Sequence, residues 1–140
     1  MTYDARMSRE ATCRRARELP GDKAAQIAAA YACDRDGFEA DAVLFYDAAY
    51  ALGARDGEFL VGYGSTLKNV GRLDESLEIL TQAEAEPSVA RASRAFRALT
   101  LHRAGASDAA IAILVRLVAE LDTPRYRPAL ESYAEELEAS

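Results

Sequence analysis

The sequence predicts an all-α protein built as a stack of antiparallel helix pairs. The main observation is a repeat: Gly37, Gly71 and Gly105 stand 34 residues apart, and side-chain size recurs at fixed distances from each of them. The composition agrees, because alanine, the strongest helix former, accounts for 30 of the 140 residues. Repeats of this length are typical of stacked helix pairs, and we expect seven or eight helices and no sheet.

The residues around each glycine predict one helix before it and one after it. Apolar residues recur on both sides at spacings of three and four, which marks one face of a helix. The glycine lies in the turn, where a positive φ is least costly for this residue type. Small residues that allow close helix contact recur seven positions before and five positions after the glycine: Ala30, Gly64 and Ala98, then Ala42, Ser76 and Ala110.

A buried core follows from this periodicity. Large apolar residues on the repeated helix faces should pack around the small ones. We expect the core to contain Ala30, Tyr46, Gly64, Leu67, Leu77, Leu80, Ala98, Leu101, Ile111 and Leu114.

Start and stop signals divide the rest of the chain. Residues 8–19 should form a helix that ends at Pro20 and Gly21, with a partly mobile arm as the alternative. A terminal helix should begin near Pro128 and run to about Leu137. Further caps and breaks are expected at Asp22, Gly53, Ser88, Ser107, Asp108, Thr123 and Pro124.

This arrangement resembles the tetratricopeptide repeat family, in which 34-residue helix pairs stack side by side. The resemblance covers three repeats, 23–56, 57–90 and 91–122, and is closest to compact bacterial members of the family. Residues 1–22 are then an N-terminal helix or arm, and residues 123–140 a C-terminal capping helix. The second repeat matches best, through Leu60, Tyr63, Gly64, Leu67, Gly71, Ser76, Leu80 and Ala83.

The third repeat departs from the family pattern early in its first helix. Arg94 and Arg97 stand where the family carries bulky residues. Two arrangements are open: the aliphatic stems of the arginines pack there, or the helix is rotated so that Phe96 and Leu99 face inward.

The resemblance implies a non-enzymatic scaffold or adaptor that binds a peptide or protein segment on the concave face formed by the first helix of each pair. Ile27 and Tyr31 hold the positions at which some members clamp a peptide carboxylate with Lys and Asn, so that clamp is absent. Because Lys68, Asn69 and Arg103 offer mainly donors, we expect an acidic or carbonyl-rich ligand. The predicted binding residues are Tyr31, Ser65, Lys68, Asn69, Phe96, Leu99, His102 and Arg103.

Self-assembly through oppositely charged ends is the alternative function. Basic residues gather near the start of the chain and acidic residues near its end, so a homo-oligomer could form by pairing of the two ends. The residues are Arg6, Arg9, Arg14, Arg15 and Arg17 on one side and Glu131, Glu135, Glu136 and Glu138 on the other.

Nucleic-acid and membrane partners are disfavoured. The net charge is −6, and the one basic stripe, Arg91, Arg94 and Arg97, has no aromatic neighbour except Phe96. The longest uncharged apolar stretch, residues 24–33, is too short to cross a bilayer. We therefore expect a cytoplasmic protein.

Catalysis, metals and cofactors are also not expected. His102 is the sole histidine, and no serine or cysteine stands at a spacing that would obviously bring it close. Cys13 and Cys33 with one histidine cannot complete a four-ligand zinc site. A disulfide between these cysteines and two reduced, inert thiols are both compatible with the sequence.

Overall fold

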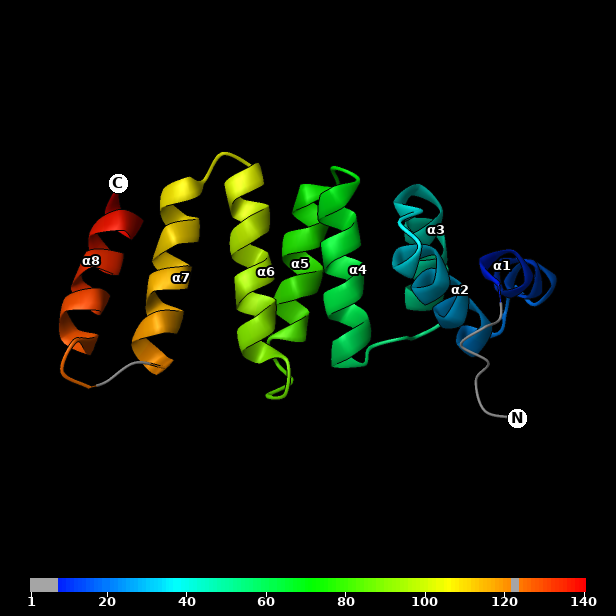
Figure 1. The fold of residues 1–140 in the computed structure, drawn as a ribbon, viewed down its shortest axis with the longest axis horizontal. Coiled ribbons are helices and arrows are strands. Elements are labelled where there is room, and N and C mark those ends of the chain that lie inside the picture. Colours follow the sequence, from blue (N-terminus) through cyan, green and yellow to red (C-terminus); the bar gives the residue numbers. More distant parts are fainter. Residues whose placement is uncertain (1–7, 122–123) are drawn as a thin grey trace. The chain divides into compact units, whose positions relative to one another are not determined.

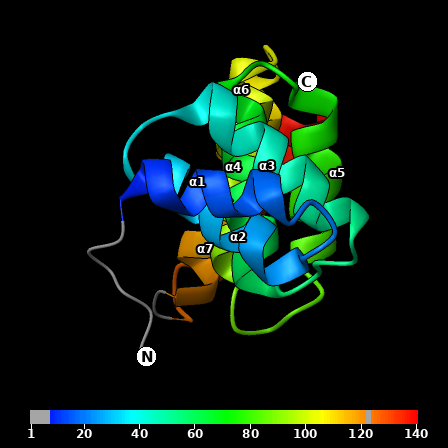
Figure 2. The ribbon, with the colours of Figure 1, turned by 90° about the vertical axis from the view of Figure 1, so that its right-hand side faces the viewer.

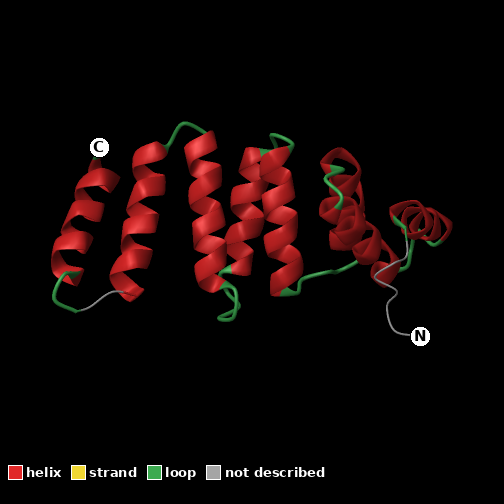
Figure 3. Cartoon of the chain, viewed as in Figure 1, coloured by secondary structure: helices red, strands yellow, loops and turns green. Residues whose placement is uncertain are grey.

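The structure is a computed structural model that describes residues 8–121 and 124–140, where the chain forms eight helices and no strand (Figures 1 and 3). The all-α prediction is confirmed. The chain divides into two compact units, Met1–Phe59 and Leu60–Ser140, and α4 begins in the first and continues in the second. The helices are α1 (Arg9–Glu18), α2 (Lys23–Arg35), α3 (Glu39–Ala51), α4 (Gly57–Asn69), α5 (Leu73–Ala83), α6 (Ala90–Arg103), α7 (Ser107–Leu121) and α8 (Arg127–Ala139).

The three glycines of the 34-residue repeat lie in three turns of the same geometry. Gly37, Gly71 and Gly105 have φ values of 82°, 86° and 88°, a region that residues with a side chain rarely adopt. The residue after each glycine donates to a carbonyl five residues back: Phe38 N to Cys33 O, Arg72 N to Leu67 O and Ala106 N to Leu101 O, at 2.8–2.9 Å. The 34-residue period of the sequence thus corresponds to a turn with the same backbone hydrogen bond in each repeat.

The predicted helix starts are confirmed in part. The Asp22 carboxylate accepts a hydrogen bond from Ala25 N at 3.0 Å and caps α2. Pro128 lies in the first turn of α8. The prediction for Ser88 is wrong: its hydroxyl donates to Glu86 instead, and α6 has no side-chain cap. Thr123 lies outside the residues that the structure describes.

In the first unit, α1 packs on α2 (Figure 2), which confirms a helix within residues 8–19. The Gln26 side-chain amide donates to Ala16 O and Leu19 O, both at 2.9 Å. These carbonyls belong to the last turn of α1 and its cap, where intrahelical donors run out. Arg9 stacks over the Phe38 ring at 3.6 Å. Buried polar and cationic contacts therefore hold this weakly apolar helix in place.

Tyr46 is the centre of the aromatic core of the first unit. Its side chain is 1% exposed, and its hydroxyl donates to the Asp34 carboxylate at 2.8 Å. Its ring lies 5.4 Å from that of Phe59 and 6.2 Å from that of Tyr31. Ala29, Ala30 and other alanines around it are fully buried, so α2 and α3 approach closely.

Cys13 and Cys33 form a buried thiol pair between α1 and α2. Their sulfur atoms are 3.3 Å apart, and both thiols are free. Burial, together with the hydrogen bond to Cys13, raises the pKa of Cys33 to about 12, so the reactive thiolate is strongly disfavoured.

We expect both thiols to react with a chromogenic disulfide reagent such as DTNB only as fast as α1 opens, because Cys13 and Cys33 are 5% and 1% exposed. Labelling followed by absorbance should be slow in buffer and at least about tenfold faster when denaturant opens the structure. Labelling at the rate of a free model thiol would contradict this packing.

The second unit contains a close contact between α4 and α5. A Cβ atom on Gly64 would lie 2.5 Å from Cγ and Cδ2 of Leu80, which is fully buried. Beside it, Ser76 Oγ donates to Gly64 O at 2.7 Å and hydrogen-bonds with Thr100 Oγ1 at 2.9 Å. A buried polar chain thus links α4, α5 and α6.

The predicted core is confirmed except on α7. Ile111 and Leu114 are 47% and 40% exposed, so their assignment to the core is wrong. The repeat predicts that a following helix covers them, but α8 packs on another side of α7. Leu77 and Leu101 are half-buried. The remaining members of the predicted core are buried: Ala30, Tyr46, Gly64, Leu67, Leu80 and Ala98.

Candidate functional site

Most of the predicted binding residues lie on α4 and α6 of the second unit. Lys68 and Asn69 end α4, and His102 and Arg103 end α6. Arg103 Nη1 donates to Lys68 O at 2.8 Å, so the ends of the two helices are joined directly. The structure therefore brings these four predicted residues together.

The positive charges at this end of α4 and α6 differ from those of Arg94, Arg97 and Arg116. Arg94, Arg97 and Arg116 each pair with a glutamate at 2.6–2.8 Å. No carboxylate pairs with Lys68 or Arg103 among residues 8–121 and 124–140. We call Lys68 and Arg103 the cationic patch.

The orientation of α6 is now settled in favour of the packed arginine stems. The Arg94 and Arg97 side chains are 23% and 27% exposed, and their guanidinium groups pair with Glu120 and Glu84. The alternative, with Phe96 and Leu99 inward, is wrong for Leu99, which is 47% exposed, whereas Phe96 is half-buried. Arg91 also lies 3.8 Å from Glu120, so the basic stripe of α6 is largely neutralised within the unit.

Leu99 belongs to a series of exposed positions that the sequence analysis did not follow to its end. Tyr31, Ser65, Leu99 and Tyr133 are spaced by 34 residues. Ser65 is half-buried, whereas Leu99 and Tyr133 are 47% and 62% exposed. Tyr133 was missed because α8 was treated as a cap, although adding 34 to 99 would have identified it.

Tyr31 lies in the first unit and has a different environment. Its ring is 37% exposed and contacts Tyr46. Burial, followed by the carboxylates of Glu58, Asp56 and Asp34, raises the pKa of Tyr31 to about 12. Its surroundings are acidic, in contrast to the cationic patch of the second unit.

His102 has a neighbour that the sequence analysis ruled out. Its Nδ1 atom lies 2.9 Å from Ser107 Oγ, because the Gly105 turn brings the start of α7 back to the end of α6. An imidazole beside a hydroxyl is the first element of a nucleophile–base pair. Here His102 is exposed and Ser107 half-exposed, so the pair is open to water.

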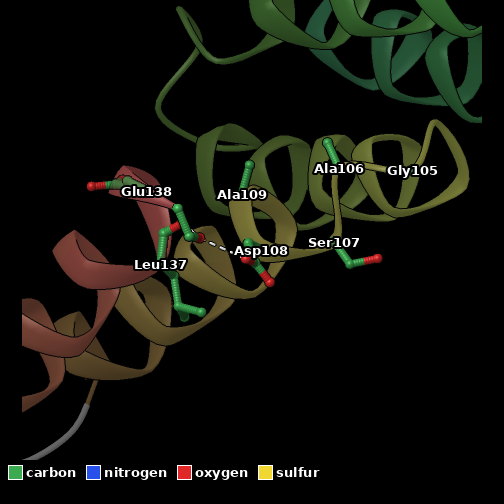
Figure 4. Close-up of a pocket in the computed structure, with 8 residues that line it drawn as sticks. Gly105, Ala106, Ser107, Asp108, Ala109, Leu137 and Glu138 are labelled. Carbon is green, nitrogen blue, oxygen red and sulfur yellow. Dashed lines mark hydrogen bonds between the residues drawn. The ribbon is translucent and has the colours of Figure 1, made fainter.

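A cavity of about 340 Å³ lies between the start of α7 and the end of α8. Figure 4 shows the side chains that line it. Ser140 Oγ donates to the Asp108 carboxylate across it at 2.6 Å. Its other acid, Glu138, pairs with Arg116, which lowers the pKa of Glu138. The lining residues are Gly105, Ala106, Ser107, Asp108, Ala109, Leu137, Glu138 and Ser140.

Within the described part of the chain, no group of His, Cys, Asp and Glu residues could hold a metal ion.

The two charged ends of the alternative function are partly neutralised within the chain. Arg9 pairs with Glu10 and Asp36, and Glu138 pairs with Arg116. Arg6 lies outside the described residues. End-to-end association stays a prediction.

Among the described residues, no helix is long and apolar enough to cross a membrane.

Searches of curated proteins and of solved structures gave no match. A family model described as "Tetratrico peptide repeat" matches residues 23–137. The match begins at the first residue of α2 and extends into α8, beyond the three repeats predicted from the sequence. Members of this family generally bind proteins or peptides and are typically non-enzymatic scaffolds. The chain belongs to the tetratricopeptide repeat family.

Proposed function

We propose that this protein is an interaction module that binds an acidic peptide segment at the cationic patch of α4 and α6. The observation that carries the proposal is the hydrogen bond from Arg103 to Lys68 O, which holds two cationic residues at adjoining helix ends. Neither has a carboxylate partner in the described part of the chain, whereas the other arginines of α6 do. A carboxylate-bearing ligand would complete their pairing.

An apolar anchor lies next to these charges. Leu99 precedes Arg103 by four residues, so the two side chains share one face of α6. Tyr133, one repeat further along the chain, is exposed on α8. We therefore propose a ligand in which Asp or Glu residues stand close to a large apolar residue, bound with micromolar affinity because the interface is small.

Peptide display on the wild-type chain, followed by fluorescence anisotropy with one selected peptide, tests this proposal. The selected sequences should be rich in Asp and Glu. Lys68→Glu should weaken binding of the peptide at least about tenfold, because it replaces attraction by repulsion, and Leu99→Ala by a smaller factor. Both residues are at least partly exposed, so circular dichroism should show unchanged helicity.

Lys23→Glu is the matched control, because Lys23 is the only other lysine in the sequence and is exposed at the start of α2. It changes the net charge equally and should leave the affinity within about twofold. If both variants lose the same affinity for the peptide, the effect is one of net charge alone. If Lys68→Glu binds the peptide with wild-type affinity, the proposed site is wrong. Tyr31→Ala in the same assay tests the prediction for the first unit.

A further inference from the structure

Helix α7 carries a stripe of exposed apolar side chains. Ile111, Leu114, Val118 and Leu121 are 47%, 40%, 52% and 67% exposed. Their spacing of three, four and three residues places them on one face of the helix. We call these four residues the α7 stripe. Scattered exposed apolar residues are ordinary, but four in line on one helix mark an interaction surface.

Three of these four positions are at least partly covered one repeat earlier, in and just after α5. Leu77 is half-buried and Leu80 fully buried, and they correspond to Ile111 and Leu114. Glu84, which corresponds to Val118, pairs with Arg97 of α6 at 2.7 Å. Leu80 meets Gly64 of α4 and Glu84 meets Arg97 of α6, so neighbouring helices cover this face.

Helix α8 packs on a different side of α7. Ala112 and Ala119 are 0% and 2% exposed, whereas the corresponding residues one repeat earlier, Glu78 and Ala85, are exposed. Arg127 Nε donates to Ala119 O at 3.2 Å. Figure 1 shows α6, α7 and α8 side by side within their unit, and the contacts of α7 with both agree. The α7 stripe is thus the face that a further helix would cover, and α8 leaves it open.

The side chains of the stripe identify a second copy of α7 as its occupant. In a heptad register, Ile111 and Val118 take the a positions and Leu114 and Leu121 the d positions. β-Branched residues at a with leucine at d favour two parallel strands, in which like positions of the two helices meet. We propose that the chain forms a parallel homodimer through the α7 stripe, with the two-fold axis along the seam between the helices.

The positions that flank the stripe support this pairing. In this register the e positions are Val115 and Asp122 and the g positions are Ala110 and Leu117, and only Asp122 is charged. A second copy would bring no like charges together along the seam, whereas helix pairs that reject one another usually do so through these positions. A two-fold interface also closes on itself, so it yields a dimer and no filament.

The size of the interface sets the expected affinity. Helix α7 has 15 residues and is about 22 Å long, and a helix pair of that length buries on the order of 1,000 Å² in total. This is near the lower limit for a specific interface, so dissociation in the micromolar range is expected.

Sedimentation equilibrium of the full chain, from about 1 µM to about 1 mM, tests the proposal. The mass should rise from that of one chain to that of two. Val118→Glu should shift the midpoint of the monomer–dimer transition at least tenfold to higher concentration. Because Val118 is half exposed, helicity and Tm should stay unchanged. Leu44→Glu, at a residue of α3 that is 63% exposed, is the matched control and should leave the midpoint unchanged.

A second measurement tests the parallel geometry. In a background of Cys13→Ala and Cys33→Ala, Val118→Cys should yield a covalent dimer in oxidised glutathione, because the two a positions face each other across the seam. Leu44→Cys should not. A monomer at every concentration would overturn the proposal, and so would a dimer that Val118→Glu leaves intact, as expected for association of the charged ends.

Discussion

Phe59→Ala is expected to lower the free energy of unfolding by about 3–5 kcal/mol, because it deletes a fully buried aromatic side chain. The Phe59 ring lies 5.4 Å from that of Tyr46, with 56° between the planes. The substitution leaves a cavity beside Tyr46 and removes the contact between the two rings. It also removes the apolar surface of the Phe59 ring that folding buries. The loss is read from urea denaturation followed by circular dichroism.

Phe38→Ala is the matched control, since the same side chain is removed where it is 44% exposed. Its stacking with Arg9 is worth only about 0.5–1 kcal/mol at an exposed site. Comparable losses in the two variants would contradict the assignment of Phe59 to the core.

Gly64→Ala is expected to cost about 1–3 kcal/mol, although alanine is the better helix former by about 1 kcal/mol. The new Cβ would lie 2.5 Å from two carbon atoms of Leu80. Because Leu80 is fully buried, it cannot swing into solvent, and α4 and α5 must separate. Gly64→Leu should be more harmful still. Thermal unfolding of each variant measures the loss.

A second substitution separates overpacking from other effects. In a Leu80→Ala background the added methyl group has room, so Gly64→Ala should then be neutral or stabilising. Gly62→Ala, on the same helix at a half-buried position, controls for helix propensity and should not destabilise. A Gly64→Ala variant as stable as wild type would show that the helices do not meet at this residue.

The helix pairs and their turns could be predicted because their determinants are local. A glycine with positive φ and small residues at fixed offsets leave a periodic record in the sequence. The exposure of Ile111 and Leu114 could not be predicted in the same way, because it depends on where α8 docks. The 34-residue pattern does not determine on which side of α7 the helix after the last repeated pair packs.

The positions of the predicted binding residues at the helix ends could be read from the sequence, but the contacts between their side chains could not. The 34-residue spacing relates Lys68 to His102 and Asn69 to Arg103. The structure joins the two helix ends through the hydrogen bond from Arg103 to Lys68 O. The pairing of Arg94 and Arg97 with glutamates 26 and 13 residues away depends on side-chain contacts between helices. The contact between His102 and Ser107 crosses a turn, where helical spacing rules do not apply.

The hydroxyl pair of Ser76 and Thr100 joins the second repeat to the third by a side-chain hydrogen bond. In the second repeat, Thr66 holds the position that Thr100 holds in the third. Tandem copies of residues 57–90 would therefore place a serine and a threonine at every junction and recreate the same bond each time. The third repeat has Ala110 where the second has Ser76, so copies of it would offer the threonine no such partner. A copy of the second repeat could thus bond to the next copy through two hydroxyl groups, whereas a copy of the third repeat could not.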